Sequence, residues 1–95
     1  MTEQQVQKKI IKCLESNGAY VVKVVSASKA GVPDILACYK GKFIGIEVKR
    51  PETKNNVSEL QKYNLAKIAN AGGYSRVFWD VKQVKIFLEE MSYDA

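Results

Sequence analysis

The sequence contains no histidine. This absence excludes Ser-His triads, HNH-type nucleases, general acid–base catalysis by histidine and zinc sites that contain histidine. Cysteine is scarce as well, because Cys13 and Cys38 are the only two and have no CxxC spacing. A structural zinc site is therefore not expected. Both cysteines lie in apolar patterns, which predicts buried free thiols.

Long apolar runs are also missing. No stretch of about 18 apolar residues occurs, so no membrane-spanning helix is predicted. The first residues, MTEQQVQKK, lack the apolar segment of a secretory signal peptide. We therefore expect a cytoplasmic protein without a membrane partner.

The composition is that of a small folded protein with a basic bias. The 95 residues are 46% hydrophobic, and residues 1–95 are predicted to form one domain. The core of such a chain is modest, which favours stabilisation by homodimer formation. Lys and Arg number 15 against 10 Asp and Glu, giving a formal net charge of +5. This excess suits a polyanionic partner, but taken alone it supports nucleic-acid binding only weakly.

Two β-prone runs in the middle of the chain predict a hairpin. They are Asp34–Tyr39 (DILACY) and Lys42–Lys49 (KFIGIEVK), and the Lys40-Gly41 pair between them marks the turn. A two-residue turn pairs the residues on either side of it, and the same register places Asp34 directly opposite Glu47. A four-residue loop preserves this register, whereas a three-residue loop shifts it by one residue.

Side chains alternate between the two faces of a strand, so Glu47 and Lys49 are expected on one face. The apolar residues Ile44, Ile46 and Val48 then take the other face, which is the natural core side. On the partner strand, Asp34 is expected to share its face with Leu36 and Cys38.

The opposed carboxylates of Asp34 and Glu47 need a physical reason. Directly opposed side chains have Cβ atoms about 4.5–5.5 Å apart, and like charges there are destabilising. A shared proton is one reason, and a divalent cation such as Mg²⁺ is the better one at neutral pH. Lys49 would then lie beside the cation, where its ammonium could orient a water or stabilise charge on a phosphoryl oxygen.

The remaining helices and strands are predicted from helix-capping residues, from the spacing of apolar residues and from residues that end helices and strands. A first helix is expected from the Thr2–Gln5 capping box to about Asn17, with Glu3 in its first turn, where the helix dipole favours a carboxylate. A second capping box joins Ser58 to Gln61. The other predicted elements are a strand at Ala19–Val25, a helix from Ser58 to about Ala71, a strand at Tyr74–Phe78 and a last helix capped by Asp80.

The nearly continuous apolar character of Ala19–Val25 predicts a strand that is central or covered on both faces. The predicted order is α-β-β-β-α-β-α, an α/β fold with a mixed sheet flanked by helices. Basic and polar loops lie on both sides of the hairpin. Ser26, Ser28 and Lys29 precede it, and Arg50 and Lys54 follow it. Each is either a DNA-backbone contact or part of a plain solvated loop.

Gly31-Val32-Pro33-Asp34 together with Glu47-Val48-Lys49 and Gln61 resembles the PD-(D/E)xK nuclease superfamily, and specifically the small VRR-NUC nucleases. The likeness runs from Glu3 to about Phe78. The resemblance implies a restriction-endonuclease-like core.

The resemblance also implies roles for individual residues. Asp34, Glu47 and the main-chain carbonyl of Val48 would bind Mg²⁺ or Mn²⁺, and Lys49 would position or activate the hydrolytic water. Many relatives use a further glutamate from the first helix. Glu3 is the candidate here, and Glu15, near the far end of that helix, is its rival. Gln61 would line the site and position water or phosphate, although helix capping alone also explains it.

The function implied is metal-dependent, structure-specific cleavage of DNA, with branched DNA such as a four-way (Holliday) junction as substrate and a homodimer as the active form. Stand-alone members this short look phage-encoded, so the cytoplasm of a bacterial host is the expected location. Two alternatives stay open: an inert nucleic-acid-binding module of the same fold, and a less structure-selective nicking or flap nuclease. Sequence-specific restriction is disfavoured because the chain has no room for a base-reading domain.

Overall fold

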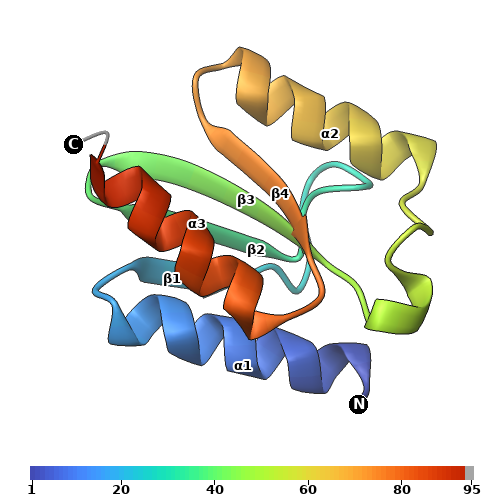
Figure 1. The fold of residues 1–95 in the computed structure, drawn as a ribbon. Helices are drawn as coiled ribbons and strands as arrows, with labels where there is room; N and C mark the ends of the chain where they lie inside the picture. The colour runs from blue at the N-terminus through green and yellow to red at the C-terminus, as the bar shows by residue number, and fades with distance from the viewer. Residues whose placement is uncertain (94–95) are drawn as a thin grey trace.

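The computed structural model describes residues 1–93, which form a mixed sheet flanked by helices (Figure 1). No helix within these residues is both long and apolar enough to cross a bilayer. The elements are α1 (Glu3–Ser16), β1 (Tyr20–Lys23), β2 (Ile35–Tyr39), β3 (Lys42–Val48), the 3-10 helix η1 (Pro51–Thr53), α2 (Glu59–Asn70), β4 (Tyr74–Phe78) and α3 (Val81–Tyr93).

The sheet has the strand order β1-β2-β3-β4. Strands β1, β2 and β3 are antiparallel neighbours, and β4 is parallel to β3. A parallel pair needs a crossover connection, and η1 and α2 supply it here. The predicted α-β-β-β-α-β-α order and mixed sheet are confirmed, with η1 as an addition inside the loop after β3.

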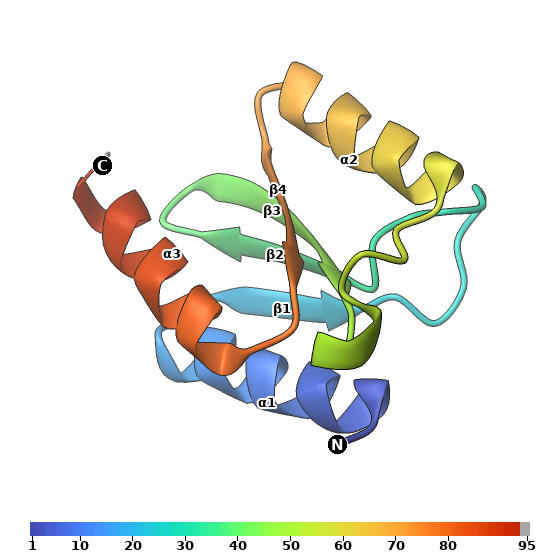
Figure 2. The same cartoon turned by 45° about the vertical axis from the view of Figure 1, so that its right-hand side comes forward.

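The main core lies between one face of the sheet and the helices α1 and α3, while α2 lies on the other side of the sheet (Figures 1 and 2). Inward residues alternate along the strands as predicted, so that Ile44, Ile46 and Val48 are fully buried. The buried apolar residues are Val6, Ile10, Leu14, Ile35, Ala37, Tyr39, Ile44, Ile46, Val48, Phe78, Val84, Phe87, Leu88 and Met91.

Both predicted capping boxes are present. The hydroxyl of Thr2 accepts a hydrogen bond from the Gln5 backbone N–H, and the Gln5 side chain accepts one from the Thr2 N–H. Ser58 and Gln61 form the same reciprocal pair at the start of α2. These caps satisfy backbone donors that the first helical turn leaves without intrahelical partners.

Two predictions about burial are wrong. The strand expected at Ala19–Val25 is shorter, Tyr20–Lys23, and lies at the edge of the sheet rather than in its centre. Its outward side chains Tyr20 and Val22 are 74% and 43% exposed, because no helix covers the second face there. Cys38 is exposed for the same reason, since its β2 position faces that side, whereas Cys13 is half-buried. Both thiols are free, as predicted.

Glycines allow α2 to approach the sheet closely. A Cβ atom on Gly45 of β3 would lie 2.6 Å from the Cδ1 of Ile68 in α2. A Cβ atom on Gly31, which precedes β2, would lie 2.7 Å from the Cγ of Leu60 and 3.1 Å from that residue's main-chain carbonyl carbon. The two glycines therefore set the height of α2 above the hairpin.

We expect Gly31→Ala to destabilise the protein more than Gly41→Ala does. The two positions have nearly the same positive φ, 80° and 79°, so the backbone strain of roughly 1–2 kcal/mol is common to both. Only Gly31 has α2 within contact distance of the added methyl, because nothing lies within 4 Å of a Cβ on Gly41. Overpacking adds a further cost of about 1–3 kcal/mol. Urea unfolding measures both, and equal losses would show that α2 does not depend on this contact.

Candidate active site

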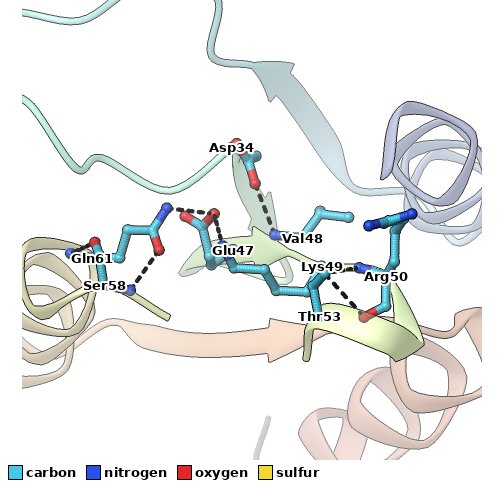
Figure 3. Close-up of polar contacts among 8 residues, drawn as sticks. All are labelled: Asp34, Glu47, Val48, Lys49, Arg50, Thr53, Ser58 and Gln61. Atoms are coloured by element: carbon cyan, nitrogen blue, oxygen red, sulfur yellow. Dashed lines mark hydrogen bonds and ion pairs between the residues drawn. The ribbon is translucent and has the colours of Figure 1, made fainter. Parts of the chain in front are cut away.

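The hairpin register brings two carboxylates together. Pairing runs from Tyr39 opposite Lys42 to Ile35 opposite Ile46, and one further step places Asp34 opposite Glu47 as predicted. The Oδ2 atom of Asp34 accepts a hydrogen bond of 2.9 Å from the Val48 N–H (Figure 3). This bond holds the Asp34 carboxylate against the end of β3. Asp34 therefore caps the end of the hairpin.

Glu47 is almost completely buried, with 2% of its surface exposed. Burial is the largest cause that raises the pKa of Glu47, and together with the hydrogen bond and the negative charge of Asp34 it brings this pKa to about 8. The Lys49 ammonium, 3.9 Å from Oε2 of Glu47, acts in the opposite direction. Without another cation, Glu47 therefore holds a proton near neutral pH.

Gln61 serves two purposes. Its Oε1 accepts from the Ser58 N–H at 3.0 Å, which completes the helix cap. Its Nε2 donates to Oε2 of Glu47 at 3.1 Å (Figure 3). Helix capping, one of the two interpretations of Gln61, is therefore confirmed, and the cap also orients the amide toward Glu47.

Lys49 continues the line of β3, because its backbone N–H donates to the Phe78 carbonyl at 3.0 Å. The residue is 9% exposed, so its charge is directed inward toward Glu47 rather than into solvent. A buried ammonium in contact with a carboxylate is unlike the solvated strand-face lysine that an isolated E-x-K pattern suggests.

Glu3 lies in the first turn of α1, and its charge contributes to the raised pKa of Glu47. The start of α1 lies beside η1, which directly follows β3 and Lys49 (Figures 1 and 2). Within residues 1–93, however, no group of three His, Cys, Asp or Glu side chains is close enough to hold an ion. Glu3 therefore does not form such a group with Asp34 and Glu47 in this structure. Glu15 is exposed near the far end of α1.

The residues expected to contact DNA lie in two exposed segments. Ser26, Ser28 and Lys29 are exposed in the loop between β1 and β2. A hydrogen bond from Asn64 of α2 to the Ala30 carbonyl, 3.1 Å long, fixes this loop beside the hairpin.

After β3, the Nε of Arg50 lies 3.9 Å from a Glu52 carboxylate oxygen. The Lys54 ammonium lies 5.3 Å from the ring centre of Trp79. Both charges remain at the surface, although each already has a partner.

Gln7 is a candidate functional residue that the sequence did not lead us to predict. It lies one turn after Glu3 on the same face of α1, is 8% exposed, and its Oε1 is a buried side-chain atom without a hydrogen-bond partner among residues 1–93. A buried polar atom normally has a partner. The signal in the sequence was a glutamine in line with Glu3, Ile10 and Leu14, on the face that should be apolar throughout.

Comparison with known proteins agrees with this geometry. The family model described as archaeal Holliday junction resolvase (hjc) matches residues 3–92. The chain belongs to this family. A solved structure titled "VRR_NUC domain" superposes with a TM-score of 0.76 and 28% sequence identity, over 92% of this chain and 94% of that one. No curated protein matches the sequence.

Membership of the resolvase family and likeness to a VRR-NUC domain establish the restriction-endonuclease-like fold and a nuclease function. The matched range, residues 3–92, spans Asp34, Glu47, Lys49 and Gln61. In this resolvase-family chain, the half-buried Asp34 and the buried Glu47 and Lys49 form, with Gln61, a cluster of ionisable and polar groups between the hairpin and α2.

Glu47 should make the metal-free protein less stable as the pH rises. Its pKa is about 8 in the folded chain against 4.5 ordinarily, so the folded state binds more protons between these values. The stabilisation is complete below the unfolded pKa and is lost as the pH rises through the folded pKa. We expect Glu47→Gln to flatten this decline and to melt higher than the parent protein above pH 8.

Thermal melts in EDTA across this pH range measure the effect. Glu15→Gln is the matched control, because it removes an exposed carboxylate of the same type and should keep the decline of the parent protein. Parallel curves for the parent protein and Glu47→Gln would mean that Glu47 is not perturbed.

Proposed function

We propose that the protein is a Mg²⁺- or Mn²⁺-dependent, structure-specific endonuclease that hydrolyses phosphodiester bonds of branched DNA, four-way junctions among them. The observation that carries the proposal is the pair of opposed carboxylates, Asp34 and Glu47, with a buried lysine beside them. Family membership supports a junction substrate.

The donor set fits a hard divalent cation. Mg²⁺ prefers oxygen ligands and typically takes one or two carboxylates, with waters and substrate phosphate completing its shell. Asp34 and Glu47 would supply the carboxylates and the Val48 carbonyl a third oxygen. Glu3 is proposed to act through a bound water. Burial and the neighbouring Asp34 carboxylate raise the pKa of Glu47, and this supports the fit because a cation between the carboxylates would offset both effects.

A bound cation would polarise the scissile phosphate and lower the pKa of an attacking water. The chain's own residues would do the rest. Gln61 holds Glu47 in place through its amide, and Lys49 presents a buried positive charge where negative charge develops on the phosphate. Lys29, Ser26, Ser28, Arg50 and Lys54 would contact the DNA backbone on either side of the site.

We expect Asp34→Asn and Lys49→Met to lower the rate of DNA cleavage by at least about a hundredfold, since each removes a charge that the transition state needs. Cleavage of a labelled four-way junction with Mg²⁺ or Mn²⁺ measures this. Glu15→Gln, which lies far along α1, should cut at the rate of the parent protein. Calorimetry with Mn²⁺ alone should show binding that Asp34→Asn loses.

An inert binding module would show no Mn²⁺ binding and no cleavage by the parent protein, and this result would contradict the proposal. Unchanged cleavage by both variants would contradict the assigned site.

The proposed active form is a homodimer. Two sites related by a two-fold axis can cut two strands of a junction symmetrically, which one site of this size cannot do in a single encounter. Light scattering should give twice the monomer mass, and junctions should be cut faster than linear duplex of the same length. A monomer, or equal cutting of both substrates, would favour the less selective nicking or flap nuclease.

A further inference from the structure

A groove of about 730 Å³ lies between α2 and the second face of the sheet. Leu36 and Phe43 line it from the sheet, and Asn64, Lys67 and Ile68 line it from α2. It has no part in the carboxylate site. None of the residues of α2 is fully buried, so the helix covers this face of the sheet only loosely and leaves the groove open.

The lining from the sheet offers a flat apolar surface. Phe43 is 48% exposed although it belongs to a central strand. The Phe43 ring packs closely against Gly73, since a Cβ atom added to Gly73 would lie 3.2 Å from the ring. This contact fixes the position of the ring. An exposed aromatic side chain held in place by a glycine is suited to stacking against another ring.

The charge of the groove has one sign. Lys29, Lys42 and Lys67 line it, and none of the aspartates or glutamates within residues 1–93 does. The Lys42 ammonium donates to the Met91 carbonyl of α3 at 3.0 Å, so its charge lies toward the opposite face of the sheet and the groove's own charges are those of Lys29 and Lys67. Lys29 and Lys67 form no ion pair within residues 1–93. The groove therefore fits a ligand that carries both negative charge and a flat apolar group.

One end of the groove adjoins the carboxylate site. Pro33 lines the groove, and the next residue is Asp34. A second copy of the chain placed here by a two-fold axis would bring like-charged lysines together, so charge favours a polyanion over a symmetric protein contact. A nucleotide combines phosphate with an aromatic base, and it matches both properties of the lining.

We propose that this groove binds an unpaired nucleotide of the DNA substrate, with its base against Phe43 and its phosphates near Lys29 and Lys67. This inference rests on the proposed function, because it names the feature of branched DNA that the nuclease recognises. Flaps, and branch points whose central base pairs open, expose unpaired bases, whereas continuous duplex does not.

Binding in EDTA tests the groove without cleavage. The probes are a duplex with a single-stranded flap that carries 2-aminopurine and the same duplex without the flap. The parent protein should bind the flapped duplex more tightly and quench the 2-aminopurine. Phe43→Ala should lose about fivefold or more of that preference, the range expected for one stacked base. Lys67→Gln should lower the salt dependence of flap binding by about 0.7 in log–log slope.

Two control variants lie on helices that cover the opposite face of the sheet. Ile86→Ala removes an exposed apolar side chain from α3, and Lys12→Gln removes an exposed lysine from α1. Both should keep the flap preference and the salt slope of the parent protein.

The inference is overturned if the parent protein has no preference for the flap, or if Phe43→Ala and Lys67→Gln behave like the controls. It is also overturned if Phe43→Ala halves the mass by light scattering, because the groove is then an interface between copies. These outcomes are separate from failure of the proposed function, which appears as absence of metal-dependent cleavage by the parent protein whatever its binding preference.

Discussion

Repulsion between the carboxylates of Asp34 and Glu47 is the constraint on which the site depends. The hairpin register places them opposite each other, and burial of Glu47 prevents water from screening the charge. Lys49 offsets part of the cost at 3.9 Å, yet the pKa of Glu47 remains near 8. A fold does not keep such an arrangement for stability alone, and clusters of perturbed carboxyl groups are typical of functional sites.

The surrounding elements hold this pair in position. Because α2 packs closely over Gly31 and Gly45, the Gln61 amide can reach Glu47. The cap that Gln61 forms with Ser58 orients this amide. The Asp34 carboxylate accepts from the Val48 N–H and so cannot turn away from β3. Elsewhere along its length, α2 has no fully buried residue, and the basic groove lies between it and the sheet.

Much of this arrangement could be predicted from local chemistry. Turn position and strand alternation are sufficient to pair Asp34 with Glu47, and capping boxes predict the starts of α1 and α2. The faces and edges of the sheet that the helices leave uncovered could not be predicted. The apolar run after Ala19 does not reveal that β1 lies at an edge, nor does the position of Cys38 reveal an uncovered face. The buried Gln7 was missed because a single polar residue in a helical pattern resembles surface.

The pKa of Glu47 tests the central claim most directly, because it reports at the residue itself the combined effect of burial and of the Asp34 carboxylate. NMR of the ¹³C-labelled carboxyl group, titrated from acid to alkaline pH without metal and with saturating Mg²⁺, measures it. The account predicts a value of about 8 without metal and a fall to well below 4.5 when Mg²⁺ is present. An ordinary pKa without metal, or a raised value that Mg²⁺ leaves unchanged, would contradict it.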